Sequence, residues 1–282
     1  MGVILGIDIG GSSTKIVGLN ADATVIGMLR VRAEDPLTSL YGALGSFLAR
    51  NGLALPDISR IILTGVGAAA VEGDIYGVPT ERVDEFSAIG TGGLALSGED
   101  RAVVVSMGTG TAFIWAERGG TVRHLAGSGV GGGTLAGLSS LITGTHQFSQ
   151  IKKLACGGDL ANVDLTIGDM ANGEVGALPV DATAANFGKL SEDATPSDLT
   201  RGLVNLVLQA IGSMCVFACQ SCATKTVILT GALTTLPQAE ETFALFNKLY
   251  DLTFIIPENA TFATSIGAAL CSLQKEDVEN TI

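Results

Sequence analysis

Three turns rich in glycine, serine and threonine contain the residues of this sequence best suited to bind an anion. They read DIGGSST from Asp8, SMGTGT from Ser106 and GSGVGGGT from Gly127. Because glycine lets the backbone come close to a ligand, consecutive N–H groups in each turn could surround a phosphate. The third turn runs directly into a helical segment, whose N-terminus adds a favourable dipole. The alternative is ordinary hairpin turns in a chain with 38 glycines, but the recurrence of the pattern favours a phosphate site.

The first turn carries the charged residues of such a site. It is not a Walker A motif, because its two glycines are adjacent and Thr14 precedes Lys15. Asp8 ends an apolar strand, where a carboxylate beside a polyphosphate would hold Mg²⁺ directly or through water. Lys15 either neutralises phosphate charge or extends its ammonium group from a strand end.

Glu85 is the candidate general base, since it stands at a strand-to-helix junction in a chain with only two histidines. Transfer of a phosphoryl group to an alcohol needs a base within reach of the hydroxyl. The competing interpretation is an acidic residue in the first turn of a helix, stabilised by the helix dipole. The residues alone leave both interpretations open.

Three of the five cysteines, Cys215, Cys219 and Cys222, share one face of a segment with helical spacing. An odd number of cysteines argues against a disulfide framework. One interpretation is an iron–sulfur or zinc site shared across a dimer. We favour small residues on a buried helix face, because three ligands on one helix are too few for a closed metal site.

The composition describes a globular chain long enough for one large or two medium domains, with 282 residues of which 47% are hydrophobic. The net charge of −12 argues against non-specific nucleic-acid binding, which needs a basic surface. The N-terminal segment lacks the basic start of a signal peptide, and no segment reaches the roughly 18 apolar residues of a spanning helix. We therefore expect a cytoplasmic protein without nucleic-acid or membrane partners.

The elements that must position the turns occur twice along the chain. An apolar strand, a glycine turn and a second strand open the sequence and recur from Arg101, so that Gly10 and Gly108 hold equivalent places. This recurrence indicates a duplicated domain, and the alternation of strands and helices predicts an α/β fold. The boundary falls near Gly98, which gives an N-terminal domain over 1–98 and a C-terminal domain over 99–282. The second domain contains a helical insertion at about 134–200. Further helices are predicted at about 37–51, 203–222, 237–249 and 263–273.

The paired hairpins DIGG and GTGT resemble those of the actin, sugar kinase and Hsp70 ATPase superfamily. Within it, the chain resembles the type II pantothenate kinases over nearly its whole length. The matching motifs, in order, are GIDIGGSSTK, LTGVGA, VDEFSAIGTG, VVSMGTGTAF, GSGVGGGTLAGLSSLITG, DATAANFGKL, VILTGAL and SIGAAL. The resemblance implies two ribonuclease H-like, actin-like ATPase domains with a nucleotide cleft between them.

The resemblance also implies an activity and the residues that perform it. The activity is transfer of the ATP γ-phosphate to the primary hydroxyl of pantothenate, with Mg²⁺, in a homodimer that acyl-CoA could inhibit. Glu85 matches the catalytic base and is preferred to its neighbour Asp84, and Asp8 stands on the metal side. The nucleotide site would comprise Asp8, Gly10, Gly11, Ser12, Ser13, Thr14, Lys15, Thr109, Gly132, Gly133, Thr134, Phe148 and Gly231.

The acceptor side departs from the family pattern. Thr111, Arg123 and His124 are the candidate substrate residues, and His124 stands where the family has an arginine on the pantothenate side. Neighbouring residues of a strand face opposite ways, so Arg123 could replace that arginine only through a backbone shift or a bulge. Ala112 stands where eukaryotic members have a serine that contacts pantothenate.

Three other functions compete with pantothenate phosphorylation. The first is a kinase of the same superfamily that acts on a sugar or a pantoate-like alcohol. The second is an ATPase activator with an iron–sulfur cluster at its dimer interface, which only the three cysteines support. The third is a nucleotide-binding regulator without catalytic activity.

Overall fold

The computed structural model describes residues 2–32, 35–171, 176 and 178–279. The first part of the chain supplies the strands of one sheet and two helices. These elements are β1 (Val3–Ile9), β2 (Ser13–Leu19), β3 (Val25–Arg32), α1 (Pro36–Asn51), β4 (Ile58–Thr64), β5 (Thr80–Arg82) and α2 (Glu85–Ser97).

The rest of the chain supplies a second sheet, the helices around it and a small two-stranded lobe. The strands are β6 (Arg101–Met107), β7 (Thr111–Glu117), β8 (Val122–Ser128), β9 (Leu165–Thr166), β10 (Thr183–Ala185), β11 (Thr226–Thr230) and β12 (Thr253–Ile255). The helices are α3 (Gly132–Thr143), α4 (Phe148–Cys156), α5 (Ile167–Met170), α6 (Pro196–Cys222), α7 (Pro237–Tyr250) and α8 (Ala263–Glu279).

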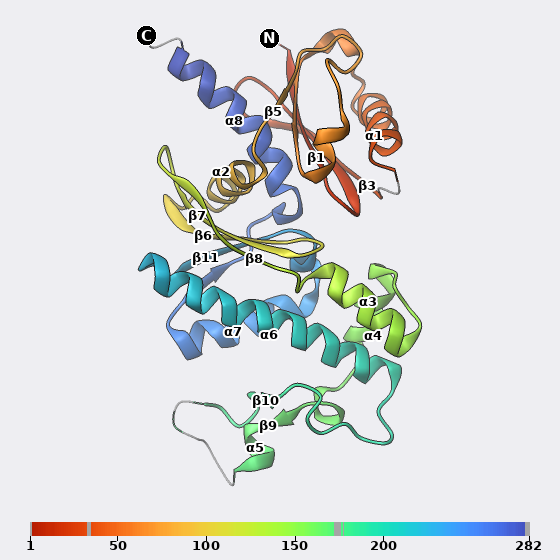
Figure 1. Cartoon of the computed structure of the whole chain (residues 1–282), viewed down its shortest axis with the longest axis vertical. Helices are drawn as coiled ribbons and strands as arrows, with labels where there is room; N and C mark the ends of the chain where they lie inside the picture. Colours follow the sequence, from red (N-terminus) through yellow and green to blue (C-terminus); the bar gives the residue numbers. More distant parts are fainter. Residues whose placement is uncertain (1, 33–34, 172–175, 177, 280–282) are drawn as a thin grey trace.

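The two large sheets have the same topology. Their strand orders are β3-β2-β1-β4-β5 and β8-β7-β6-β11-β12. In each sheet the central strand pairs antiparallel with the next strand of the chain and parallel with a later strand. This repetition confirms the predicted fold of two duplicated α/β domains, which lie one above the other in Figure 1.

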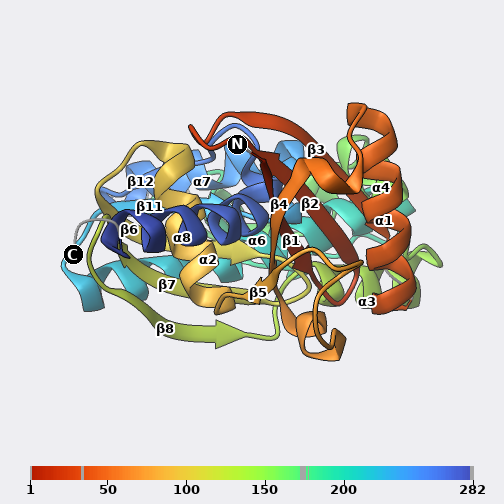
Figure 2. The ribbon, with the colours of Figure 1, turned by 90° about the horizontal axis from the view of Figure 1, so that it is seen from above.

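Helices cover both faces of each sheet, so the molecule is layered (Figure 1). The helix α1 packs on the outer face of the first sheet, where Leu44 and Phe47 are fully buried. The helix α6 covers the outer face of the second sheet together with α7. Between the sheets lie α2 and α8, which Figure 2 shows crossing one another beside the first sheet.

The chain returns to its first domain at its end. The helix α8 follows the last strand of the second sheet, yet it packs against β1, β2 and β4 of the first. Ile266 and Ala269 lie in the same apolar cluster as Ile4 and Val17. The domain boundary near Gly98 stays a prediction, but the packing of α8 joins residues from both ends of the sequence in one layer.

Glycines make the crossing of α2 and α8 close. A Cβ at Gly92 would lie 1.9 Å from the carbonyl oxygen of Ala263, and one at Gly267 would lie 1.8 Å from that of Ala88. Real Cβ atoms do not come so near to backbone, so these positions accept only hydrogen as a side chain. The helix that begins with Glu85 is therefore held against α8 by direct backbone contact.

The helix α6 begins earlier than its apolar pattern predicts. Thr195 and Asp198 form a capping box, in which the Thr195 hydroxyl accepts from the Asp198 N–H and the Asp198 carboxylate accepts from the Thr195 N–H. Pro196 occupies the first helical position. By length and composition α6 could cross a membrane, but 61% of its apolar window is buried inside the protein, as in a core helix.

The predicted insertion contains more than helices. The helices α3 and α4 pack on α6. The following segment turns away and forms a lobe, in which β9 and β10 pair antiparallel beside the short α5. Figure 1 shows this lobe at the end of the molecule farthest from the first sheet.

Candidate active site

The three glycine turns meet between the two sheets. The hydroxyl oxygens of Ser12, in the β1–β2 turn, and Thr109, in the β6–β7 turn, lie 3.5 Å apart. The third turn joins the second through its backbone, because Gly132 N–H donates to the Gly108 carbonyl and Gly133 N–H donates to the Thr109 carbonyl, both at 2.8 Å. The three turns, which are spread from residue 12 to residue 133 of the sequence, thus lie together in one site.

The backbone bonds change the roles expected for two glycines. Gly132 and Gly133 donate their N–H groups to carbonyls, so these groups are not free for a phosphate. Their small size has a different use, since a Cβ at Gly132 would lie 2.9 Å from the Gly108 oxygen and one at Gly133 would lie 3.0 Å from a Thr109 methyl. Among the exposed turn residues, Gly11, Ser12 and Thr109 have backbone N–H groups that donate no hydrogen bond to a described residue, so these amides could face a ligand.

Asp8 and Lys15 face the space between the domains. They are directly opposite in the β1–β2 pairing, and Lys15 Nζ lies 2.8 Å from Asp8 Oδ2. Both side chains are largely buried, and Asp8 is only 5% exposed. Along β1 and β2, Asp8 and Lys15 alternate with apolar residues that pack against α1. Both side chains therefore lie on the opposite face of the first sheet, which α2 and α8 cover.

Thr14 lies on the other face of the same sheet. It pairs with Ile9, is fully buried, and its hydroxyl has no hydrogen bond within the described part of the chain. Only its backbone could contact a ligand between the domains. The neighbouring Ser13 is also buried, and its carbonyl accepts the Gly10 N–H at 3.1 Å, which closes the turn.

Glu85 stands at the start of α2, close to the Asp8–Lys15 pair. Burial raises the pKa of Glu85, the negative charge of Asp8 raises it further, and the positive charge of Lys15 lowers it. Its neighbour Asp84 has a different task, because the Asp84 carboxylate caps the helix by accepting from the Ser87 N–H at 2.9 Å. A half-buried carboxylate with a raised pKa suits a general base that works near neutral pH.

The β7–β8 register separates the two candidate acceptor residues. His124 pairs with Ile114, whose side chain lies in the core between the second sheet and α2, whereas Arg123 pairs with Trp115 of the α6 side. A bulge does occur, between Ile114 and the preceding pair, but it leaves His124 on the side of α2.

Phe86 fixes the position of His124. The two rings stack with centroids 4.2 Å apart and planes 18° apart. Phe86 follows Glu85 directly, so the imidazole stacks on the residue next to the candidate base. The sequence analysis assigned no role to Phe86, and its only signal was its place after the acid in VDEF.

The remaining predicted residues support the turns rather than face a ligand with free polar groups. The Thr111 hydroxyl donates to the Val130 carbonyl at 2.8 Å, and the Thr134 hydroxyl donates to the Gly129 carbonyl at 2.7 Å. Phe148, at the start of α4, packs against the core of the second domain. Gly231 has a φ of +91°, and a Cβ there would lie 2.6 Å from the Met107 oxygen.

Gly65 is a site residue to which the sequence analysis assigned no role. It follows β4, has a φ of +87°, and a Cβ there would lie 2.7 Å from Asp8 Oδ1. Any side chain would displace the carboxylate, so the glycine keeps Asp8 in place. The motif LTGVGA contained this signal as a glycine directly after a buried strand.

Asp8 fits a magnesium ion held mainly by phosphates. Mg²⁺ keeps several waters and takes one or two carboxylates, together with phosphate oxygens. Lys15 bonds to Oδ2 of Asp8, and Oδ1 has no hydrogen bond to any described residue. Asp8 would therefore supply one oxygen from the floor of the site.

The cysteines form no metal site in the part of the chain that the structure describes, where no group of three His, Cys, Asp or Glu residues could hold an ion. Cys215 and Cys219 are buried in the core of the second domain. Burial raises the pKa of Cys219 to about 12 and that of Cys215 well above its usual range, so both stay thiols. They pack as small apolar residues, as favoured from the sequence.

Curated relatives match most of the chain. A type II pantothenate kinase of Oceanobacillus iheyensis is 30% identical over 215 residues, which cover 73% of this chain and 80% of the relative. A type II pantothenate kinase of Staphylococcus aureus is 27% identical over 270 residues, or 89% of this chain and 97% of the relative. Two family models also match, Fumble over residues 102–250 and the BadF/BadG/BcrA/BcrD ATPase family over 5–152.

Solved structures share the fold at low sequence identity. The activator of the 2-hydroxyisocaproyl-CoA dehydratase from Clostridium difficile, with bound ADPNP, has a TM-score of 0.72 at 17% identity, covering 99% of this chain and 98% of that one. A ROK family glucokinase from Streptomyces griseus, in complex with glucose and AMPPNP, has a TM-score of 0.59 at 11% identity, covering 96% and 99%. The fold and the joined turns define a two-domain ATPase fold of the actin-like class. Within that class the chain belongs to the type II pantothenate kinase family.

Proposed function

We propose that the protein is a pantothenate kinase. It transfers the γ-phosphate of ATP to the primary hydroxyl of pantothenate and forms 4′-phosphopantothenate, the first step of coenzyme A biosynthesis. The observation that carries this proposal is the place of Glu85, which lies close to the Asp8–Lys15 pair and directly before Phe86 of the stack with His124. One carboxylate is thus close both to a phosphate-binding turn and to a wall where an alcohol could bind.

The nucleotide would lie over the joined turns between the domains. The amides of Gly11 and Ser12 and the ammonium of Lys15 would face its phosphates, and Asp8 would hold Mg²⁺. When bound, Mg²⁺ neutralises charge that develops on the transferring phosphoryl group. Thr109 and Gly231 would border the nucleotide from the second domain.

Glu85 moves the proton in the transfer. Its carboxylate accepts the proton of the pantothenate hydroxyl while that oxygen forms a bond to the γ-phosphorus. The bond between the γ-phosphorus and its bridging oxygen breaks, and ADP leaves with the electron pair. The raised pKa of Glu85 favours this step, because it makes the carboxylate a stronger base than an ordinary glutamate.

His124 would contact the carboxylate end of the acceptor. Its ring is held by Phe86 and lies on the α2 side of β8, whereas Arg123 lies on the opposite face. Ala112 shares the face of His124 and packs against the same core. The resemblance further predicts a cytoplasmic homodimer and inhibition by acyl-CoA, and these stay predictions.

The test is an assay of the purified protein with Mg-ATP and pantothenate. We expect 4′-phosphopantothenate, identified by mass spectrometry, and no turnover with glucose or an N-acetylhexosamine. Turnover of a sugar without phosphopantothenate would show a different kinase of the same class.

Glu85→Gln separates catalysis from nucleotide binding. We expect kcat to fall by about 10²- to 10⁴-fold, the usual contribution of a general base, while ATP affinity is retained. The matched control is Asp84→Asn, since asparagine also caps helices and this side chain faces Ser87. Full activity in Glu85→Gln with loss in Asp84→Asn would reverse the assignment of the base.

A further inference from the structure

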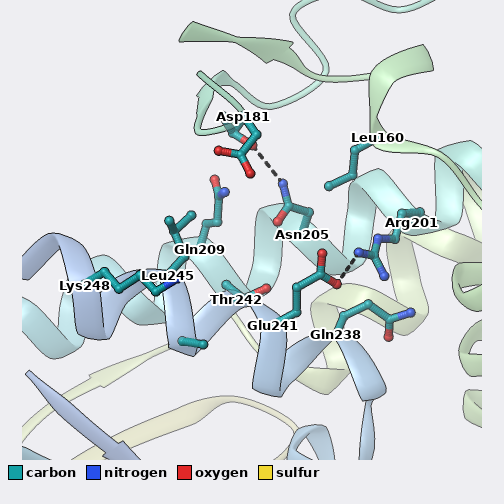
Figure 3. Close-up of a pocket in the computed structure, with 12 residues that line it drawn as sticks. Leu160, Asp181, Arg201, Asn205, Gln209, Gln238, Glu241, Thr242, Leu245 and Lys248 are labelled. Atoms are coloured by element: carbon teal, nitrogen blue, oxygen red, sulfur yellow. Dashed lines mark hydrogen bonds and ion pairs between the residues drawn. The ribbon is translucent and has the colours of Figure 1, made fainter. Parts of the chain in front are cut away.

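A cavity lies on the outer side of the second sheet, away from the glycine turns. It has a volume of about 310 Å³ and sits between α6, α7 and the lobe that contains β10 (Figure 3). This volume is at the lower end of the range for small-molecule sites, roughly 300–1,000 Å³. None of its lining residues belongs to the candidate active site.

The cavity wall carries four charged side chains, of which two pair with each other and two have no ion partner among the described residues. Arg201 and Glu241 pair with each other at 2.6 Å. Asp181 and Lys248 form no ion pair with any residue that the structure describes. Asp181 belongs to the lobe and Lys248 to α7, so the two charges come from different walls of the cavity. A ligand with one positive and one negative end would satisfy both.

The floor of the cavity presents an acceptor and a donor. Asn205 and Gln209 are one turn apart on α6 and point into the space beneath Asp181 (Figure 3). Asn205 Nδ2 is used, since it donates to the buried carboxylate of Asp164 at 2.7 Å, and Gln209 Oε1 accepts from Asn186 at 3.3 Å.

These bonds leave two amide atoms available. Asn205 Oδ1 and Gln209 Nε2 have no hydrogen bond to the described residues. One accepts and the other donates, which matches the N–H and C=O of a peptide group. Because the network around Asp164 fixes both side chains, their orientation is set before a ligand arrives.

We propose that this cavity binds a short peptide with free termini. Its ammonium group meets Asp181, its carboxylate meets Lys248, and a peptide group bonds to Asn205 and Gln209. The site is separate from the active site, and the inference does not depend on which alcohol the enzyme phosphorylates.

Titration calorimetry with triglycine tests the proposal on the full-length protein. Triglycine carries both charges and peptide groups and has no side chain, so it probes the shared chemistry alone. We expect one molecule to bind per chain. Triglycinamide, which lacks the carboxylate, and N-acetyltriglycine, which lacks the ammonium group, each bind about tenfold more weakly.

Two variants assign the charges. In Lys248→Gln, triglycine and triglycinamide bind with equal affinity, because the group that distinguishes them is gone. In Asp181→Asn, triglycine and N-acetyltriglycine bind with equal affinity for the same reason. The control is Lys153→Gln, an exposed lysine of α4 outside the cavity, which keeps the wild-type preferences.

A third variant fixes the location. Ala244→Trp fills the cavity without removing a charged or amide group, and we expect it to abolish binding while circular dichroism stays unchanged. The proposal is overturned if wild type shows no binding at millimolar triglycine or if it binds all three peptides equally. It is also overturned if folded Ala244→Trp still binds triglycine.

Discussion

Burial and the charges of Asp8, Lys15 and Asp84 set the pKa of the candidate base, Glu85. Glu85 is half-buried at the start of α2, and its pKa is raised by burial first and by Asp8 second, whereas Lys15 lowers it. The Asp8–Lys15 bond therefore does two things, since it holds both groups in the site and partly cancels the effect of Asp8 on Glu85. Substituting either Asp8 or Lys15 therefore changes the pKa of Glu85 while Glu85 itself stays in place.

The pH dependence of activity tests this arrangement. The base must be ionised, so kcat/KM falls as the pH drops through the raised pKa of Glu85. Asp8→Asn removes a charge that raises this pKa, and we expect the acidic limb to move to lower pH. Lys15→Met removes a charge that lowers it, and the limb moves to higher pH.

The measurement is the midpoint of the acidic limb from pH–rate profiles of the three proteins. Its position is informative even if both substitutions also reduce the maximal rate. Shifts of both variants in the same direction would show that Glu85 is not the titrating base.

At the residue scale, the sequence predicts contacts that follow from the geometry of a hairpin, but it does not predict contacts between distant residues. Asp8 and Lys15 face each other because they flank one short turn, and both were assigned to the site from sequence. Alternation along a strand also predicts that Arg123 and His124 face opposite ways, but not which of them faces α2. The stack of Phe86 on His124 joins residues 38 positions apart, and no local pattern predicts such a contact.

The element on which the site depends most is α2, and its position rests on glycines. Gly267 of α8 touches α2 so closely that a Cβ would lie 1.8 Å from the Ala88 oxygen and 2.6 Å from the Gly92 nitrogen. Helical periodicity predicts both helices, yet it contains no information on how near they approach. The same limit applies to α6, whose first turn follows from its capping box and not from its apolar pattern.

We expect Gly267→Ala to lower both stability and kcat. The added methyl group would overlap backbone atoms of α2, which cannot rotate away as a side chain can. The helix α2 must therefore move, and Glu85 moves with it. Overpacking of this kind costs about 1–3 kcal/mol or more. Thermal unfolding and the kinase assay provide the two measurements.

The control for this substitution is Gly45→Ala in α1. A Cβ there meets nothing within 4 Å, so the change removes a flexible residue from a helix and stabilises the protein by about 0.5–1 kcal/mol. If Gly267→Ala retained wild-type stability and activity, the close approach would not determine the position of α2.

At the scale of the whole molecule, the sequence shows that the domain is duplicated, but it does not show how the two domains pack together. The recurrence of a strand, a glycine turn and a strand predicts two domains with like sheets, and the strand orders confirm it. The return of α8 to the first sheet depends on contacts between Ala269 and residues near the N-terminus. Such long-range packing follows only from the folded structure.

The shared layer of α2 and α8 predicts how the molecule unfolds. A chain of 282 residues with two domains would ordinarily lose them in separate steps. Here α2 belongs to the first half of the sequence but packs on the second sheet and on α8, and α8 belongs to the second half but packs on the first sheet. Unfolding one domain would expose the core of the other, so we expect a single cooperative transition in urea.

Two probes can decide this. Trp115 is the only tryptophan and packs against the core of the second domain, so its fluorescence follows that domain. Circular dichroism follows both domains. Coincident midpoints and slopes of the two curves are the expected result, since the domains then lose their structure together. A phase in the circular dichroism curve without a counterpart in fluorescence would mean that the first domain unfolds by itself, against the expected role of α8.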